Sequence, residues 1–298
     1  MRAGRRAQKC HTLPFHRKGP PVKLATIREG GRTRAVRIDG DQAVDLGADD
    51  VGEVLRRDGW QAWAAARQGP GRPVAGLDYA PVVPAPGKIV CVGLNYRSHI
   101  LEMGRELPEH PTLFAKYRQA LIGAHDDIVL PAVSDQVDWE AELAVVVGAR
   151  ARHVTAGAAP RAIAGYAVLN DVSVRDYQGR TLQWLQGKTF EATTPLGPWL
   201  VTADESPGPA REVTCEVGGE LMQKGDSSDL VFDPAALVAY VSSIITLEPG
   251  DVIATGTPGG VGAARTPPRF LVAGETVVTR IAGLGECRNT CRKERVGP

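Results

Sequence analysis

A series of short apolar runs, rich in valine and isoleucine, limits the folds that this chain can adopt. Runs of this length and composition predict buried β-strands, and they do not alternate regularly with helical patterns. A doubly wound parallel sheet is therefore disfavoured, and we predict a strand-rich α+β fold that is rolled or barrel-like. The runs are KIVCVGLN, DIVLP, AELAVVVG, IAGYAVLN, LVFD, DVIATG and ETVVTRIAGLG.

Composition along the chain divides it into three segments. Residues 1–21 are basic and lack periodic apolar residues, so we expect a disordered extension, either transit-like or produced by a start codon placed too early. Residues 22–85 contain alternating short strands separated by Glu-Gly-Gly and Asp-Gly turns, then a single helical pattern capped by Asp49 or Asp50, and predict a small N-terminal β-rich domain. After a connector dense in proline and glycine, residues 86–292 form the main domain.

Overall composition excludes several functional classes. The 298 residues carry a formal net charge of +1, which gives no overall bias toward nucleic acid. No apolar run reaches the roughly 20 residues that a membrane-spanning helix needs. Five scattered cysteines, with no pair of CxxC motifs, indicate a reducing compartment and neither a disulfide framework nor a zinc site. We therefore expect a soluble, cytoplasmic protein whose basic extension is solvated and binds neither RNA nor membrane.

The run DWEAELAVVVG, residues 138–148, is a predicted strand that begins with acidic residues. Successive side chains of an extended chain point to opposite faces, so Asp138, Glu140 and Glu142 would share one face. Carboxylates two residues apart repel each other and lower the stability of a strand. Two interpretations stay open: a cation neutralises the acidic face, or the carboxylates face solvent on an edge strand.

A third carboxylate follows another predicted strand. Asp171 comes directly after the run AIAGYAVLN, and Ser173 is placed to cap a helix that would begin there. If that turn is helical, Arg175 and Gln178 project to nearly the same side as Asp171. Two carboxylates from one strand and a third from the end of another would make an oxygen-only site with open positions. Such a site suits Mg²⁺ or Mn²⁺ better than zinc.

The main domain contains, in this order, the motifs KIVCVGLNYRSH, DWEAELAVVVG, NDVSVRD, QGKTF, PLGPWLVT, LEPGDVIATGTPGGVG and GLGECRN. In this order and spacing they resemble the fumarylacetoacetate hydrolase family, over a stretch from about residue 88 to residue 289. The resemblance implies a fold made of a rolled mixed β-sheet and a homodimer. It also implies a divalent cation, Mg²⁺ or Mn²⁺, held by Glu140, Glu142 and Asp171, so that the acidic face is paired with an ion.

The same resemblance assigns roles within the segment NYRSHILEMG. His99 and Glu102 are three residues apart, so on a short helix they are neighbours, and a carboxylate beside an imidazole orients it and raises its basicity. The resemblance implies that they form a general-base dyad. The segment from Arg97 to His110 resembles a lid that orders over bound substrate in relatives.

Five further side chains are placed in the site by the resemblance. Lys188 in QGKTF matches a lysine near the metal, where an ammonium can be pushed toward its neutral form and shuttle a proton; Lys116 in TLFAK is a weaker candidate of the same kind. Arg175 and Gln178 match the pair that contacts substrate oxygens. Thr257 lies in ATGTPGGVG, a turn that offers backbone N–H groups and a hydroxyl to an anion and lacks the Gly-Lys-Ser/Thr ending of a P-loop.

These assignments predict a metal-dependent hydrolase of carbon–carbon bonds that acts on a small 2-oxo acid. A water activated by His99 with Glu102 would attack the distal ketone of an acylpyruvate-like, fumarylpyruvate-type 1,3-diketo acid. The products would be a carboxylic acid and a pyruvate enolate, which Lys188 or water would protonate. Relatives with the same triad also isomerise, decarboxylate or hydrate related 2-oxo acids and 2-hydroxy-dienoates in aromatic catabolism, and that alternative stays open. The distal group of the substrate is expected to contact Tyr117, Arg118 and Trp184.

Overall fold

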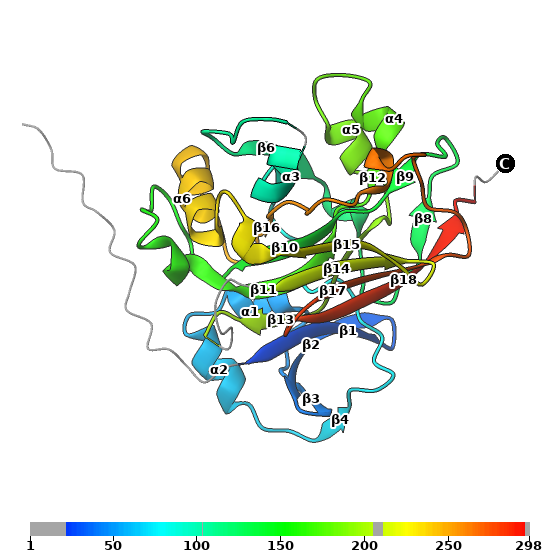
Figure 1. Ribbon diagram of the computed structural model, residues 1–298. Helices are drawn as coiled ribbons and strands as arrows, with labels where there is room; N and C mark the ends of the chain where they lie inside the picture. Colours follow the sequence, from blue (N-terminus) through cyan, green and yellow to red (C-terminus); the bar gives the residue numbers. More distant parts are fainter. Residues whose placement is uncertain (1–21, 103, 205–210, 296–298) are drawn as a thin grey trace, which may run out of the picture.

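The computed structural model describes residues 22–102, 104–204 and 211–295. The predicted basic extension, residues 1–21, lies outside the described residues. An eleven-stranded sheet and a five-stranded sheet form the frame, with one further pair of strands and short helices around them (Figure 1). The prediction of a strand-rich α+β fold is confirmed.

The eleven-stranded sheet is mixed. Most of its neighbours are antiparallel, but β16 runs parallel to β5 and β7 runs parallel to β13. The strand order is β4-β3-β2-β1-β13-β11-β10-β16-β5-β6, with β7 beside β13. The bounds are β1 Lys23–Glu29, β2 Arg32–Asp39, β3 Gln42–Asp45, β4 Gly71–Pro73, β5 Ile89–Gly93, β6 Thr112–Lys116, β7 Leu121–Ile122, β10 Ala141–Val147, β11 Ile163–Asn170, β13 Thr194–Thr202 and β16 Val252–Ala254.

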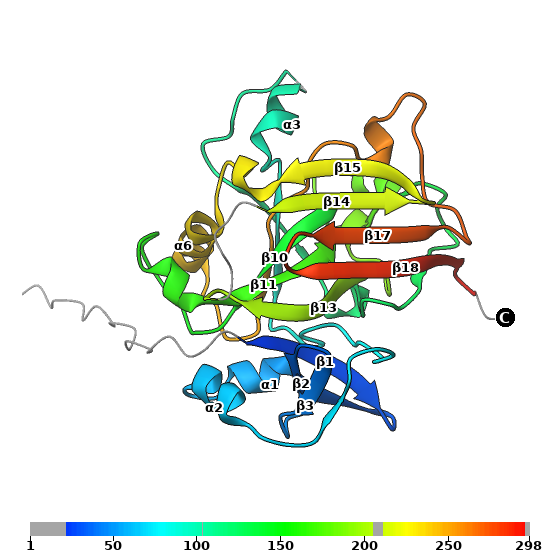
Figure 2. The ribbon, with the colours of Figure 1, turned by 60° about the horizontal axis from the view of Figure 1, so that its bottom comes forward.

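The five-stranded sheet packs against one face of the large sheet. In Figure 2 its longer strands run side by side across the molecule. Between the two sheets lies an apolar core that includes Leu143 and Val168 from one sheet and Val213 and Val277 from the other. The order is β15-β14-β17-β18-β8, with bounds β8 Ile128–Leu130, β14 Glu212–Val217, β15 Glu220–Asp226, β17 Thr276–Ile281 and β18 Gly285–Lys293; β9 Val137–Asp138 pairs separately with β12 Ser173–Val174.

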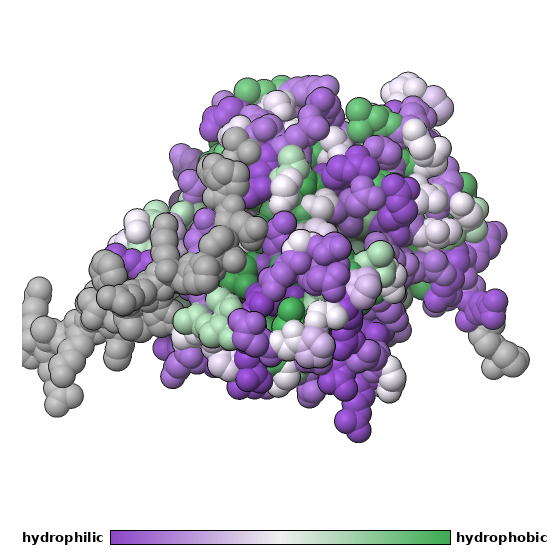
Figure 3. Space-filling model, turned by 90° about the horizontal axis from the view of Figure 1, so that it is seen from below, coloured by the Kyte–Doolittle hydropathy of each residue, from purple (hydrophilic) through white to green (hydrophobic). Residues whose placement is uncertain are grey.

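The N-terminal strands extend the large sheet. β1 pairs antiparallel with β13, so that Leu24 lies opposite Leu200, and the chain from β1 to β4 adds one strand after another to that edge. The prediction of a β-rich N-terminal unit thus corresponds to one end of a continuous sheet. Figure 3 shows the face on the side of β3, β4 and α2, where hydrophilic residues surround scattered apolar ones.

The predicted single helix near residue 50 is two short helices in the structure. Asp50 caps the first by accepting a hydrogen bond from the Glu53 backbone N–H, as predicted. Gly59, which precedes the second helix, has a φ of 67°. This left-handed conformation interrupts the helical path, because a right-handed helix needs a negative φ at every residue. The prediction of one helix was therefore wrong.

Short helices cover the edges of the sheets, and three of them lie on the side of the molecule opposite the N-terminal strands (Figure 1). Those three, α3, α4 and α5, carry predicted site residues. No helix among the described residues has both the length and the apolar character to cross a membrane. The bounds are α1 Val51–Leu55, α2 Trp60–Ala66, α3 Arg97–Glu102, α4 Arg175–Gln178, α5 Leu185–Lys188 and α6 Pro234–Ile244, with 3₁₀ turns at Arg118–Ala120, Ala159–Ala162, Ser227–Asp229 and Gly262–Ala264.

Candidate metal centre and its cavity

The acidic segment is not one continuous strand. It is interrupted between β9, which ends at Asp138, and β10, which begins at Ala141, so the regular alternation of faces is lost there. The Asp138 carboxylate accepts hydrogen bonds from Arg175 Nε at 2.7 Å and from the Gly262 backbone N–H at 2.7 Å. Arg175 Nη1 donates to Glu140 at the same distance, so Asp138 and Glu140 point toward one guanidinium, but Asp138 is not part of the carboxylate group that could hold an ion.

Glu140, Glu142 and Asp171 do come together. Each offers a carboxylate oxygen, these oxygens lie within 4.8 Å of one another, and all three residues are buried. The pairing of β10 with β11 sets Ala141 opposite Asn170, which brings Asp171 beside Glu140. The Asp171 backbone N–H donates to the Glu140 carbonyl at 2.8 Å and fixes this approach. A strand end and a strand start thus build the triad, as their positions in the sequence predicted.

Two buried lysines neutralise part of this charge. Lys188 Nζ donates to Glu140 Oε2 at 2.7 Å and to Asp171 Oδ2 at 2.9 Å, and Lys116 Nζ donates to Asp171 Oδ1 at 2.5 Å. Burial disfavours the charged form of Asp171, but the two lysines outweigh it and lower the pKa of its carboxyl. Burial likewise opposes the charge on Lys188, but Asp171 and Glu140 outweigh it and raise the pKa of the amine. In this arrangement Lys188 is an ammonium.

Glu142 differs from the other two carboxylates. Among the described residues it is in no ion pair, and its Oε2 accepts a hydrogen bond from the Gly256 backbone N–H at 2.8 Å. Burial, followed by repulsion from Asp171 and Glu140, raises the pKa of Glu142 well above its usual range. A cation beside Glu142 would therefore stabilise the charged form of its carboxylate.

A divalent cation fits this donor set. The ligands would be the carboxylate oxygens of Glu140, Glu142 and Asp171, which suit Mg²⁺ or Mn²⁺ better than a softer ion. A cation among them would also remove the repulsion that acts on Glu142.

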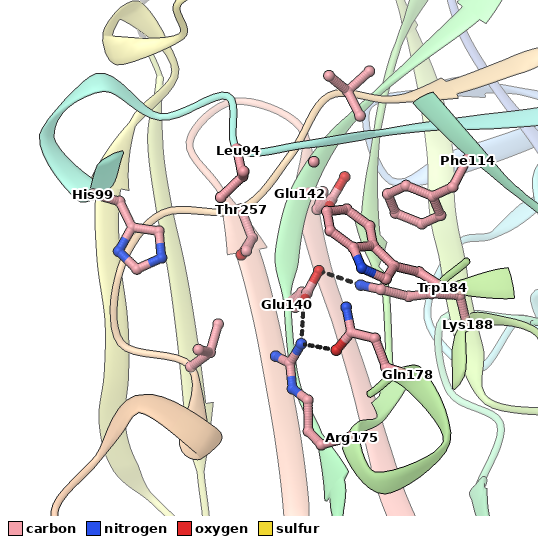
Figure 4. A pocket seen from close by; sticks show the side chains of 13 residues that line it. Leu94, His99, Phe114, Glu140, Glu142, Arg175, Gln178, Trp184, Lys188 and Thr257 are labelled. Atoms are coloured by element: carbon pink, nitrogen blue, oxygen red, sulfur yellow. Dashed lines mark hydrogen bonds and ion pairs between the residues drawn. The ribbon is translucent and has the colours of Figure 1, made fainter. Parts of the chain in front are cut away.

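Arg175 and Gln178 approach the triad from α4. Arg175 Nη1 donates to Glu140 Oε1 at 2.7 Å and to Gln178 Oε1 at 2.9 Å (Figure 4). Arg175 Nη2 is buried and has no hydrogen-bond partner among the described residues. An unpartnered guanidinium N–H group beside the carboxylate triad of Glu140, Glu142 and Asp171 is suited to bind the carboxylate of a ligand. Ser173 does not cap this helix as predicted, because its hydroxyl donates to the Asp171 carbonyl at 2.8 Å.

A cavity of about 170 Å³ joins these groups (Figure 4). One part of its wall is polar and contains most of the predicted site residues, whereas the other part is apolar and aromatic. Lys116 and Asp171 do not line it and lie buried behind the wall. The lining residues are Val92, Gly93, Leu94, His99, Phe114, Glu140, Glu142, Arg175, Gln178, Trp184, Lys188, Thr257 and Val261.

The aromatic part of the wall depends on close packing at one glycine. The Trp184 ring lies so near Gly93 that a Cβ at that position would stand 2.4 Å from Trp184 Cζ3. Phe114 meets Trp184 edge to face, with ring centroids 5.4 Å apart. Of the three side chains expected near the substrate's distal group, only Trp184 lines this cavity; Tyr117 is 58% exposed and Arg118 is also exposed.

The predicted dyad is close but not hydrogen-bonded. His99 Nδ1 lies 4.0 Å from Glu102 Oε2, beyond hydrogen-bond distance, and is buried without a partner among the described residues. The Glu102 side chain is 78% exposed and borders a neighbouring depression that also includes His99. Ser98 holds α3 in place through two hydrogen bonds to Asp229 Oδ2, from its N–H at 2.9 Å and its hydroxyl at 2.5 Å.

The Gly-rich turn donates its N–H groups to the protein's own carboxylates. Gly256 donates to Glu142, and the backbone N–H groups of Gly262 and Ala263 donate to Asp138. The turn therefore supports the acidic segment, which the glycine pattern alone did not indicate. Sequence reasoning also missed the role of Asp138 as the partner of Arg175.

The profile described as fumarylacetoacetate (FAA) hydrolase C-terminal matches residues 88–292, more than half of the chain. The chain belongs to the fumarylacetoacetate hydrolase family. Its matched region contains the triad, both lysines and every residue that lines the cavity. The family resemblance seen in the sequence motifs is thereby confirmed.

Relatives within the fumarylacetoacetate hydrolase family carry different activities in their names. Over 225 residues, 74% of this chain and 72% of theirs, it is 45% identical to the mitochondrial oxaloacetate tautomerase FAHD2B of Bos taurus and 44% identical to FAHD2A of Homo sapiens. A solved structure of maleylpyruvate hydrolase from Sphingobium sp. SYK-6, in complex with manganese (II) ion and pyruvate, is 30% identical. It superposes with a TM-score of 0.76 over 92% of this chain and 100% of that one. The chain is thus similar to oxaloacetate tautomerases and to a hydrolase whose solved structure contains manganese.

Proposed function

We propose that this protein is a divalent-metal-dependent tautomerase that interconverts the keto and enol forms of a small 2-oxo acid of the oxaloacetate class. The observation that carries the proposal is the unpartnered Nη2 of Arg175, a residue that lines the same cavity as Glu140 and Glu142 of the carboxylate triad. Similarity to the mammalian oxaloacetate tautomerases supports it.

The substrate carboxylate is assigned to Arg175 and Gln178. Nη2 of Arg175 supplies a charged donor, and Glu140 and Gln178 hold the guanidinium in place through Nη1. When bound, Mg²⁺ or Mn²⁺ would supply Lewis-acid polarisation of the oxygens of a 2-oxo acid. The cavity of about 170 Å³ is below the roughly 300–1,000 Å³ that is usual for drug-sized ligands, which favours a small acid.

Tautomerisation requires a proton to leave the carbon next to the ketone and a proton to reach the ketone oxygen. Lys188 Nζ and the His99 ring both line the cavity and both carry exchangeable protons. Lys188 is held between Glu140 and Asp171, so its ammonium is placed to give a proton to an oxygen or carbon near the triad. His99 lies across the cavity from Lys188 (Figure 4), which places a second proton carrier on the other side of a bound acid.

The test is the rate of decay of enol oxaloacetate, followed by its ultraviolet absorbance, with Mn²⁺ or Mg²⁺ and with chelator. We expect catalysis that needs the metal and falls roughly a hundredfold in Lys188→Met, the usual contribution of one positioned proton carrier. Arg175→Lys tests substrate binding, because it keeps a cation but loses the unpartnered Nη2 donor, and it should raise KM more than it lowers kcat. If enol oxaloacetate decays at the uncatalysed rate in the presence of the protein, with metal and with chelator alike, the proposal is rejected.

Hydrolysis of an acylpyruvate is the second proposed function. It is favoured by His99, whose Nδ1 is buried, has no hydrogen-bond partner among the described residues and lies 4.0 Å from Glu102 Oε2. The similarity to maleylpyruvate hydrolase also favours it. A hydrolase needs a base for water, so His99→Ala should cost about a hundredfold in turnover of an acylpyruvate while oxalate binding persists. We expect Glu102→Gln to cost less, because its carboxylate is exposed and 4.0 Å away. Near-normal acylpyruvate cleavage in both variants would reject the hydrolytic dyad.

A further inference from the structure

One buried side-chain amide connects the five-stranded sheet to the backbone of Ala141, which lies between the triad residues Glu140 and Glu142. Gln223 lies in β15, is 1% exposed, and reaches the start of β10. Its Nε2 donates to Thr257 Oγ1 at 2.8 Å and to the Pro258 carbonyl at 2.9 Å. Its Oε1 accepts from the Ala141 backbone N–H at 2.9 Å. All the hydrogens of this amide are therefore used inside the protein.

The chemistry of its partners fixes the orientation of the Gln223 amide. A backbone N–H can only donate, so the group facing Ala141 must be the oxygen, and a carbonyl can only accept, so the group facing Pro258 must be the nitrogen. The reversed amide would set two donors against each other at Ala141 and two acceptors at Pro258. Nε2 therefore faces Thr257 and donates to its hydroxyl oxygen.

The Thr257 hydroxyl has one proton, and its position follows from the same reasoning. Oγ1 lies 2.9 Å from the Ala141 carbonyl, an acceptor, so the hydroxyl proton is donated there. One lone pair of Oγ1 receives the hydrogen bond from Gln223, and one lone pair remains. Thr257 also lines the cavity beside Glu140 and Glu142 (Figure 4). A ligand that reaches Oγ1 from the cavity would therefore meet a lone pair, to which it can donate a hydrogen bond but from which it cannot accept one.

We propose that Gln223 is a positioning residue that fixes Thr257 as a hydrogen-bond acceptor toward the cavity, so that this point of the site selects a ligand atom that carries a hydrogen. In the proposed reaction that atom is the hydroxyl oxygen of an enol, or a water, and not a carboxylate oxygen. The inference rests on the proposed function for its choice of small 2-oxo acids as ligands. It also changes the sequence expectation that the Thr257 hydroxyl is offered to an anion.

A matched pair of ligands tests this directly. Oxalate and oxamate have nearly the same shape, but oxamate has an NH₂ donor where oxalate has a carboxylate oxygen. Calorimetric titration of the Mn²⁺-loaded protein gives a Kd for each, and the ratio of the two is compared between variants, so that the difference in ligand charge cancels. Thr257→Val keeps the size of the side chain and removes the acceptor, so we expect the ratio to shift about fivefold toward oxalate, the effect of one hydrogen bond.

Gln223 is tested through its dependence on Thr257. Gln223→Met removes the donor that fixes the hydroxyl, so the ratio should shift in the same direction as in Thr257→Val. The double variant should show no more than the shift of Thr257→Val alone, because both changes act on one group. Gln223→Glu, which keeps an acceptor for the Ala141 N–H, is the alternative if Gln223→Met does not fold, and Thr257→Ser, which keeps the hydroxyl, is the matched control. Thermal melting and Mn²⁺ titration identify variants with general damage.

Several outcomes overturn the inference. If the ratio of affinities is unchanged in Thr257→Val, or if the Gln223 and Thr257 effects add in the double variant, Gln223 does not act through an acceptor at Thr257. If the ratio moves toward oxamate, the hydroxyl donates to the ligand and the assigned direction is wrong. Failure of both ligands to bind the wild-type Mn²⁺ protein would instead overturn the proposed function together with the inference.

Discussion

Glu142 is the residue whose charge is least compensated in the site. Glu140 and Asp171 are each paired with at least one cation, whereas Glu142 has only a backbone N–H as its partner among the described residues. We predict that Glu142→Gln weakens Mn²⁺ binding so far that added metal no longer raises the melting temperature, because stabilisation by a ligand depends on its affinity for the folded state. Turnover should fall roughly a hundredfold or more. An unchanged metal titration would contradict the assignment of the triad.

The same residue gives a prediction about pH. The pKa of Glu142 is raised in the folded protein, so between the ordinary glutamate range and the raised value the folded state binds more protons than the unfolded state. Stability of the metal-free wild type should therefore fall as pH rises through that window. Metal-free Glu142→Gln lacks this loss and should melt higher than metal-free wild type at the upper end. The measurement is the melting temperature of both proteins across a pH series with chelator. The same pH dependence in wild type and Glu142→Gln would rule this out.

Residue-level prediction from the sequence succeeded where the signal was local. Glu140 and Glu142 alternate along one run and Asp171 ends another, so their positions suggested the triad, and the family resemblance decided between a metal site and a solvent-facing edge. Asp138 belongs to the same run, but its role as the partner of Arg175 depends on a residue 37 positions further along the chain, which the run itself does not indicate. Gln223 gave no signal, because its partners lie in segments far along the chain that only the packing of two sheets brings together.

At the level of elements, the pair α4 and α5 presents three of the site's polar side chains. The two short helices cross so closely that a Cβ on Gly187 would stand 2.4 Å from the Gln178 backbone nitrogen. We predict that Gly187→Ala forces the helices apart, at a cost of about 1–3 kcal/mol in the free energy of unfolding, as in other overpacked sites. It should also displace Lys188 and reduce turnover. Gly179→Ala, where the nearest atom to a Cβ is 3.5 Å away, is the matched control, and equal effects of the two changes would contradict this account.

The proposed lid is held at both ends. Ser98 in α3 is bonded to Asp229, Ile100 is buried, and the His110 ring stacks on Tyr240 with centroids 6.1 Å apart. These contacts are more than its sequence suggested, but Leu101 and Glu102 between them are exposed. We predict that amides of residues 97–102 and 104–110 exchange faster without ligand than with Mn²⁺ and oxalate. Strong and equal protection in both states would show that the segment is fixed structure.

At the scale of the whole molecule, the N-terminal unit shares its core with the main sheet. One apolar cluster includes Leu24 and Trp60 from the N-terminal strands and helices, and Val146 and Leu200 from the main sheet. Composition and turn signals predicted that this unit exists, but they could not show that β1 pairs with β13, since strand pairing over such a distance depends on the tertiary fold.

This shared core predicts a single unfolding transition. Besides the pairing of β1 with β13, Arg28 forms two hydrogen bonds to Asp126, from Nη1 at 2.9 Å and from Nη2 at 2.6 Å, and the Val22 backbone N–H donates to Thr202 Oγ1 at 3.0 Å. Amides of β2 and β10 should therefore lose protection at the same denaturant concentration, which hydrogen exchange across a urea series measures together with circular dichroism. A chain that starts at residue 86 should aggregate, because β13 would then be an exposed edge over an open core. Earlier release of β2, or a soluble and active truncated chain, would show that the N-terminal unit is an independent domain.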